Sequence, residues 1–162
     1  MLLKQDGSVW TTGVNKYGQL GDGVGRSSSS AFVLTIVSGA KTMAAGGYHS
    51  IVLKQDGSVW TTGQNIYGQL GDGSSLRNSR GTFMKVIFGE VEVIAAGSYH
   101  SMVLTQDGGV WAAGWNKYGQ LGDGSTNTSH SFVQVIGTCD VWLWSICTLT
   151  TPLLSPSCLT VQ

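Results

Sequence analysis

Two histidines lie in a sequence pattern that could support nucleophilic catalysis. Each is followed directly by a serine, and an aspartate lies seven residues after each histidine. A serine nucleophile needs a histidine within hydrogen-bond distance to accept its proton, and an acid that orients the histidine. The candidates are the nucleophiles Ser50 and Ser101, the bases His49 and His100, and the acids Asp56 and Asp107.

The repetition of this set argues against catalysis. A catalytic triad is one site with one geometry, whereas equivalent positions in successive repeats lie on separate structural units. We therefore interpret His49 and His100 as structural residues. Their side chains are expected to form hydrogen bonds with the backbone between neighbouring strands.

Calcium binding is a second candidate chemistry, because Asp22, Asp72 and Asp123 each lie in a Gly-Asp-Gly segment. A calcium ion needs about six to eight oxygen ligands that converge on one point. One such aspartate in each repeat does not supply them, so we expect these residues to form turns. The glycine-rich segments also lack the Gly-Lys-Ser/Thr ending of a phosphate-binding loop.

Trp10, Trp60 and Trp111 recur in the same way. A photoreceptor would need tryptophans that cluster on one exposed surface, so we expect these side chains to pack between structural units instead. All of the candidates thus have a structural interpretation. We predict no catalytic residue, no cofactor-binding residue and no metal ligand in this chain.

The recurrence comes from one long motif that is written three times. It reads LKQDGSVWTTGVNKYGQLGDG from Leu3, LKQDGSVWTTGQNIYGQLGDG from Leu53 and LTQDGGVWAAGWNKYGQLGDG from Leu104. The copies are about 50 residues apart, and a fixed period of this length indicates a repeat architecture.

Each copy begins with a predicted β-hairpin. An Asp-Gly pair lies between two β-prone runs at 3–12, 53–62 and 104–113. Glycine readily adopts the positive φ that a primed hairpin turn requires, so this pattern predicts antiparallel strand pairs with primed turns. Two further short strands are predicted before each complete hairpin, which gives four strands in about 50 residues. These further strands are Phe32 to Val37, Thr42 to Ala45, Phe83 to Phe88 and Val91 to Ala96.

The composition excludes several classes of partner. Only 11% of the residues are charged and the formal net charge is zero, so the chain has no basic surplus that would attract nucleic acid or an anionic membrane. No apolar run is long enough to span a membrane. The N-terminal residues do not form a signal peptide, which favours an intracellular location, in the cytoplasm or the nucleus.

The last 25 residues differ from the rest of the chain. The repeat stops after Gly137, and a segment rich in Thr, Leu, Ser and Pro occupies 138–162. It contains all three cysteines, whose spacing matches neither a zinc site nor a disulfide framework. We expect this non-repeat tail to pack poorly and its cysteines to be unpaired.

The motifs together resemble the regulator-of-chromosome-condensation repeat. The similar elements are Ala-Ala-Gly-x-Tyr-His-Ser, Leu-x-x-Asp-Gly-x-Val-Trp and Gly-x-Asn-x-Tyr-Gly-Gln-Leu-Gly, and they extend over residues 1 to about 137. The resemblance implies a β-propeller, usually of seven blades. Its members include an exchange factor for the small GTPase Ran, a plant ultraviolet-B photoreceptor, modules of HECT-type ubiquitin ligases and bacterial inhibitors of β-lactamase. Protein binding through loops is what they share.

The number of repeats here is smaller than the resemblance implies. Seven blades need roughly 350 residues, whereas this chain has 162. We therefore predict an all-β, incomplete β-propeller of four-stranded antiparallel blades, and a piece of a longer protein. Its predicted units are a half repeat at 1–23, full repeats at 31–73 and 82–124, and the start of another at 131–137.

The expected function is that of a protein–protein interaction scaffold without enzymatic activity or cofactor. Two alternatives remain open. One is a guanine-nucleotide exchange factor, which would make a small GTPase the partner, and the other is a regulatory module of a ubiquitin ligase. The terminal units of an incomplete propeller would expose apolar faces and strand edges, so we also expect the chain to associate with itself.

Overall fold

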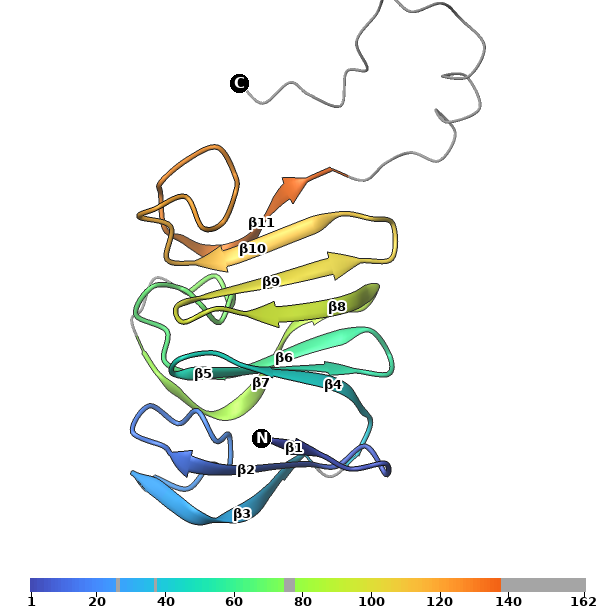
Figure 1. The fold of residues 1–162 in the computed structure, drawn as a ribbon, viewed down its shortest axis with the longest axis vertical. Coiled ribbons are helices and arrows are strands. Elements are labelled where there is room, and N and C mark those ends of the chain that lie inside the picture. Colours follow the sequence, from blue (N-terminus) through green and yellow to red (C-terminus); the bar gives the residue numbers. More distant parts are fainter. Residues whose placement is uncertain (26, 37, 75–77, 138–162) are drawn as a thin grey trace, which may run out of the picture.

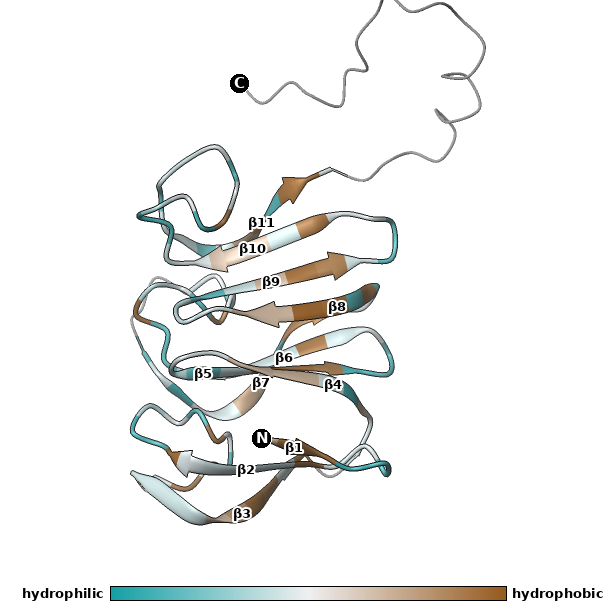
Figure 2. Ribbon diagram, viewed as in Figure 1, coloured by the Kyte–Doolittle hydropathy of each residue, from teal (hydrophilic) through white to brown (hydrophobic). Residues whose placement is uncertain are grey.

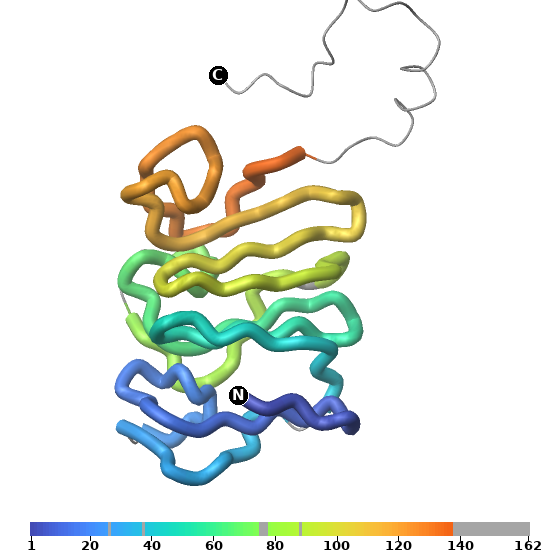
Figure 3. The backbone as a smooth tube through the Cα atoms, viewed as in Figure 1, coloured from blue at the N-terminus to red at the C-terminus, as the bar shows by residue number. Residues whose placement is uncertain are grey.

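The computed structural model describes residues 1–25, 27–36, 38–74 and 78–137. These residues form eleven β-strands and no helix, so none of them forms a helix that could cross a membrane. The strands make three antiparallel sheets that lie one beside another as layers (Figures 1 and 3). The predicted all-β architecture, an incomplete β-propeller built from four-stranded antiparallel blades, is confirmed. The predictions for the non-repeat tail concern residues outside this description.

We name the three sheets blades 1 to 3 in chain order. Blade 1 has the strand order β1 (Leu2–Leu3), β2 (Val9–Val14) and β3 (Ser28–Ile36). Blade 2 has the order β4 (Ala40–Ala45), β5 (His49–Lys54), β6 (Ser58–Gly63) and β7 (Arg80–Phe88). Blade 3 has the order β8 (Val91–Ala96), β9 (His100–Thr105), β10 (Val110–Gly114) and β11 (Ser129–Ile136).

The blades group the strands differently from the predicted units. The strand predicted at 32–37 was assigned to the hairpin that follows it, but β3 pairs with β2 of the preceding hairpin. In the same way β7 completes blade 2, and β11 completes blade 3 instead of starting another unit. The physical reason is that the chain leaves each hairpin, makes a long loop and returns to pair with the strand it has just left.

The predicted hairpins form as expected, with a different turn. β1 pairs with β2, β5 with β6, and β9 with β10. The turn of blade 2 has three residues, and Gly57 donates its N–H to the carbonyl of Lys54 at 3.0 Å. Gly57 has a φ of 76°, but Asp56 does not have a positive φ, so the turn is not of the primed type. A three-residue loop with glycine in the left-handed region is the next commonest hairpin connection.

The hydrophobic core lies between the blades. Figure 2 shows hydrophobic residues along the strands and hydrophilic residues at the turns and loops on both ends. One cluster joins blades 1 and 2 through Val9, Ile36, Ala40 and Val52, and a second joins blades 2 and 3 through Ile51, Leu53, Val59, Val91, Ile94 and Val103. Each buried aliphatic side chain of this size contributes about 1.5–3 kcal/mol, so each blade is stabilised mainly by its neighbours.

A compact loop follows each of the hairpins β1–β2, β5–β6 and β9–β10. We call it the exit loop, and the three exit loops are 13–23, 63–73 and 114–124. Asn65 holds the exit loop of blade 2 together. Its side-chain oxygen accepts the N–H of Leu70 at 3.1 Å, and its Nδ2 donates to the carboxylate of Asp72 at 3.0 Å. Asn15 and Asn116 make the same two contacts in their own loops. Because Asn65 and Leu70 are fully buried, these bonds satisfy polar groups that water cannot reach.

The exit loops of blades 1 and 2 each pack on the outer strand of the next blade. Gly21 lies against the ring of Phe83, and a Cβ at Gly21 would come within 2.5 Å of that ring. Gly71 lies against the ring of Phe132 in the same manner. Gly23 also donates its N–H to a carbonyl of β7, at 2.9 Å, and an equivalent bond joins the second exit loop to β11. The joint between blades therefore combines aromatic packing on glycine with backbone pairing.

His49 links blade 2 to blade 3. Its Nε2 lies 2.9 Å from the Oγ of Ser101, and Ser101 donates its only proton to the carbonyl of Gln69 at 2.7 Å. The imidazole must then carry its proton on Nε2 and donate it to the serine. The predicted structural role is correct, but the histidine bonds a side chain of the next blade and not the backbone. The imidazole ring of His49 lies against Gly46, so that no side chain would fit at position 46.

Removal of the Asn65 side chain tests how strongly the exit loop stabilises the fold. We expect Asn65→Ala to lower the free energy of unfolding by about 2–4 kcal/mol, because the buried N–H of Leu70 and the carboxylate of Asp72 each lose a partner. Arg80→Ala is the matched control, since this side chain is 42% exposed and forms a 3.0 Å ion pair with the same carboxylate. It should cost less than about 1 kcal/mol. Equal losses in urea unfolding would contradict this explanation.

The buried imidazole predicts a pH dependence of stability. Burial lowers the pKa of His49 from 6.5 to about 4, with a smaller effect from His100. Between these values the unfolded chain binds a proton that the folded chain does not. The contribution of neutral His49 to the free energy of unfolding is therefore complete above pH 6.5. As the pH falls to about 4, this free energy decreases by on the order of 3 kcal/mol.

This dependence is measurable as the difference in unfolding free energy between the chain and a His49→Gln variant across that pH range. We expect the difference to shrink as the pH falls. The matched control is His100→Gln, because burial also lowers the pKa of the half-buried His100 and the effect should be smaller. A difference that does not change with pH would exclude a buried neutral imidazole.

Candidate protein-binding face

The structure separates the residues of the two candidate catalytic sets, in which we predicted no catalysis. His49 begins β5 and Asp56 lies beyond the other end of that strand, and β9 separates His100 from Asp107 in the same way. A strand of six residues is about 20 Å long, so neither acid can orient its histidine. Ser101 is fully buried, and its hydroxyl donates to a backbone carbonyl. The hydrogen-bonded pair of His49 and Ser101 therefore joins two blades, and both side chains are buried from any substrate.

The Gly-Asp-Gly aspartates form turns, as predicted. Besides its bond from asparagine, each carboxylate accepts the N–H of the residue two positions further along. The distances are 3.1 Å for Asp22, 3.0 Å for Asp72 and 2.9 Å for Asp123. These hydrogen bonds lower the pKa of Asp123. Within the described ranges, no three His, Cys, Asp or Glu side chains come together as they would around a metal ion.

The recurring tryptophans have mixed surroundings. Trp111 packs against the cluster between blades 2 and 3, as predicted. Trp10 and Trp60 each also carry a lysine ammonium over the indole ring, at 4.4 Å for Lys4 and 4.6 Å for Lys54. The tryptophans therefore contribute to packing and to cation–π contacts within single blades.

Aromatic side chains gather where the exit loops and the β4–β5 and β8–β9 turns meet. Each belongs to one of these segments, and together they cross all three blades without a break. We call this set the aromatic row, and its members are Tyr17, Tyr48, Tyr67, Tyr99, Trp115 and Tyr118.

Neighbouring rings of the row are in van der Waals range of one another. The ring centroids are 5.3 Å apart for Tyr17 and Tyr48, 6.1 Å for Tyr48 and Tyr99, 6.0 Å for Tyr99 and Trp115, and 5.3 Å for Trp115 and Tyr118. Three of these four pairs meet edge to face, with interplanar angles of 77–82°. Edge-to-face pairs add roughly 0.5–1.5 kcal/mol each beyond their buried area, so the rings hold one another in place.

Backbone hydrogen bonds fix the segments that carry these rings. The carbonyl of Tyr48 accepts an N–H from the first residue after β6, and that of Tyr99 accepts the N–H of Trp115, both at 2.9 Å. In the exit loop of blade 2, Tyr67 donates its N–H to the Oε1 of Gln69 at 3.0 Å. The same tyrosine ring lies 5.4 Å from Tyr99 and 5.8 Å from Trp115. The row is thus built on a rigid frame.

The row is accessible to a partner. Tyr48 is 39% exposed and Tyr118 is 77% exposed, and the other rings are half-buried. A hollow with a volume of about 360 Å³ adjoins the row at Tyr17. It lies between the exit loop of blade 1 and the residues next to Arg80 at the start of β7.

Lysines mark both ends of the row. Lys16 lies 5.5 Å from the ring of Tyr17, and Lys117 lies 5.8 Å from the ring of Tyr118. The middle exit loop has Ile66 at the same position. The row therefore combines an apolar centre with a positive charge at each end.

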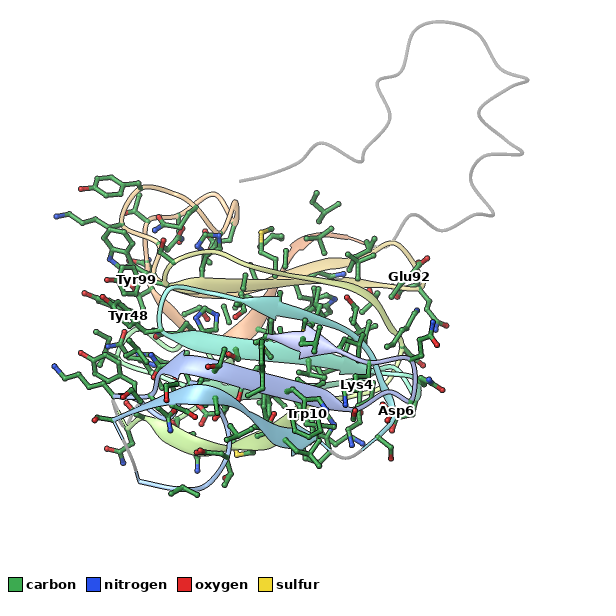
Figure 4. The ribbon with its side chains drawn as sticks, turned by 60° about the horizontal axis from the view of Figure 1, so that its bottom comes forward. Lys4, Asp6, Trp10, Tyr48, Glu92 and Tyr99 are labelled. Carbon is green, nitrogen blue, oxygen red and sulfur yellow. The ribbon has the colours of Figure 1, made fainter. Side chains whose placement is uncertain are left out.

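Carboxylates gather at the other end of the blades. Figure 4 shows Tyr48 and Tyr99 on one side of the molecule, and Asp6 and Glu92 on the opposite side. The β5–β6 turn carries Asp56 on that opposite side, because β5 runs away from Tyr48. The two ends of the blades thus differ in chemistry, because the aromatic row lies at one end only.

This row was not predicted from the sequence. Leu70 is the buried anchor of the exit loop of blade 2, whereas Tyr67 contacts rings of the next blade. The available signal was the recurrence of tyrosine in two motifs, ahead of His-Ser and ahead of Gly-Gln-Leu-Gly. Only the arrangement of the blades brings the two motifs together.

Comparison with known protein families matches the chain to the regulator of chromosome condensation (RCC1) repeat. The match covers residues 6–53, 56–104 and 107–136. A second description of the same repeat matches 40–69 and 91–120. The matched residues make up well over half of the chain.

Individual relatives share shorter or more distant similarity. The X-linked retinitis pigmentosa GTPase regulator homolog of Caenorhabditis elegans is 44% identical over 43 residues, which is 26% of this chain and 3% of the relative. Among solved structures, yeast RCC1 (Prp20), determined with Kap60 bound, has a TM-score of 0.73 at 20% identity. This match covers 84% of this chain and 34% of that one. Human WBSCR16 has a TM-score of 0.71 at 26% identity, over 82% of this chain and 36% of that one.

The chain therefore spans only a small part of the curated relative and about a third of the similar solved chains. Within that part, the repeat motif and the overall fold agree with the same family. The chain belongs to the family of proteins built from RCC1 repeats.

Proposed function

We propose that this chain is a protein-interaction module that binds its partner through the aromatic row. The observation that carries the proposal is the unbroken set of six rings across three blades on a rigid frame. Tyrosine and tryptophan are enriched among the residues that dominate binding energy at interfaces, because they supply large contact areas with little loss of side-chain freedom.

The charge pattern restricts the chemistry of the partner. An apolar or aromatic surface fits the centre of the row, and carboxylates fit its ends, where Lys16 and Lys117 lie. Tyrosine hydroxyls can also donate hydrogen bonds to carboxylates. The partner is thus a protein segment with an apolar centre and acidic flanks, and its binding weakens as salt screens the lysines.

Binding without catalysis is part of the proposal. The polar residues that recur in the repeats already serve the fold: the asparagines and aspartates of the exit loops bond each other, and Ser101 bonds the backbone. A small GTPase is the partner class to test first, because the curated relative carries GTPase regulator in its name.

Peptide selection tests the row directly. Peptides selected from a phage-displayed random library on the folded chain should be enriched in apolar and acidic residues. Their affinity for Tyr99→Ala should be at least about tenfold lower, since a tyrosine at the centre of an interface contributes roughly 2 kcal/mol or more.

Glu92→Ala is the matched control, because this exposed residue lies at the other end of blade 3. It should leave the affinity unchanged, and thermal unfolding should establish that both variants fold. Selected peptides that bind Tyr99→Ala as well as the unchanged chain would refute the proposal.

A further inference from the structure

The joint between blades 1 and 2 differs from the joint between blades 2 and 3 at one residue of the outer strand. Gly81 of β7 and His130 of β11 are equivalent, because each accepts the backbone N–H of the last residue of the neighbouring exit loop. The donors are Gly23 and Gly73, at 2.9 and 3.0 Å. The chain therefore places an imidazole ring at the second joint where the first joint has no side chain.

The imidazole of His130 lies on the exit loop of blade 2. A Cβ on Gly68 of that loop would come within 2.8 Å of the Nδ1 of His130, so the ring packs against this glycine. The Nδ1 atom is buried and has no hydrogen-bond partner among the described residues. Because this nitrogen makes no hydrogen bond to the loop, the place accepts the ring for its flat shape, and another aromatic ring would meet the same surface.

The first joint leaves the corresponding place open. Gly18 is the equivalent of Gly68, and the three atoms nearest to a Cβ there all belong to the backbone of Arg80 and Gly81. No heavy atom of the described residues lies within 4 Å of the place that a Cβ on Gly81 would occupy. Gly18 and Gly81 both line the hollow of about 360 Å³ beside the aromatic row. The hollow thus occupies the position that the His130 ring fills at the second joint.

The walls of the hollow suit an aromatic side chain that comes from outside the chain. Glycines make up much of its lining, and they are Gly18, Gly23, Gly25 and Gly81. Phenylalanine rings lie on glycines of the exit loops elsewhere in the molecule. Tyr17 and Lys16 also line the hollow, and the ammonium of Lys16 is 5.5 Å from the ring of Tyr17. The hollow therefore combines a ring, a flat backbone surface and one positive charge.

We propose that the hollow receives an aromatic side chain of the protein partner, and that an acidic residue next to it in the partner pairs with Lys16. This inference rests on the proposed function, because the hollow adjoins the aromatic row at Tyr17. His130 closes the corresponding place at the second joint. The aromatic residue therefore anchors one end of the partner segment and sets its direction along the row.

Variants of the full chain can fill the hollow from within. Gly81→His gives the first joint the ring of the second, and Gly81 does not have a positive φ, so a side chain is tolerated there. Gly81→Val is a second filling variant, with a smaller β-branched side chain that suits a strand. Ser30→His is the matched control. Ser30 is exposed, has the same register position on β3 and does not line the hollow.

The probes are peptides selected on the unchanged full chain from a phage-displayed random library. They should share an aromatic residue beside an acidic one, and replacement of that aromatic residue by alanine should lower the affinity at least about tenfold. Gly81→His should weaken binding of the parent peptide by a similar factor and Gly81→Val by less, whereas Ser30→His should bind it as the unchanged chain does. On Gly81→His the alanine peptide should bind as well as the parent peptide, because the ring and the hollow form one contact. Thermal unfolding should establish that each variant folds.

Three results would each overturn the inference: selected peptides without a shared aromatic residue, full affinity of the parent peptide for the variants at Gly81, or losses from the peptide change and from Gly81→His that add. The proposed function fails in a different way, when the peptides bind Tyr99→Ala as well as the unchanged chain. Loss of affinity on Tyr99→Ala with none on the variants at Gly81 would support the aromatic row and exclude the hollow. The two failures are therefore separate outcomes.

Discussion

The fold depends on one constraint, which is that a four-stranded sheet with two apolar faces cannot cover itself. Each blade buries its faces on its neighbours, and the clusters around Val52 and Ile51 lie on opposite faces of the same strand. The exit loop follows from the same constraint. It reaches over to the next blade, and the fit of Gly71 to Phe132 sets the distance between the two sheets. Packing of the blades therefore decides where the loops and turns lie, and with them the row.

Most of the polar residues in the motif serve this packing. Asn65 bonds the backbone of its own loop, and Ser101 and His49 close a buried contact between blades. A residue that recurs in every repeat is suited to packing blades together, because every blade must bury its apolar faces on its neighbours. Function is better sought in residues that the frame positions without using them, and the tyrosine rings are of this kind.

The sequence was sufficient for the parts of the fold that depend on local chemistry. The hairpins were predicted from Asp-Gly and flanking strands, and the turn role of Asp72 from its surroundings in the motif. The grouping of strands was wrong, because β7 begins 17 residues after the end of β6 and lies much closer in sequence to β8. The row could not be predicted, since Tyr67 and Tyr99 belong to different motifs and meet only when two blades pack.

The same geometry explains how a repeated frame can be specific. Equivalent positions in blades 2 and 3 supply Tyr48 and Tyr99, and the exit loops supply the rings beside them, so each further blade of this kind would lengthen the row. Positions that the frame leaves free vary from blade to blade. Trp115 stands where the other blades have Val14 and Gln64, and it contacts three rings of the row. Under the function that we propose, selectivity for a partner resides in such non-repeating side chains, while the repeating ones supply the general affinity of an aromatic surface.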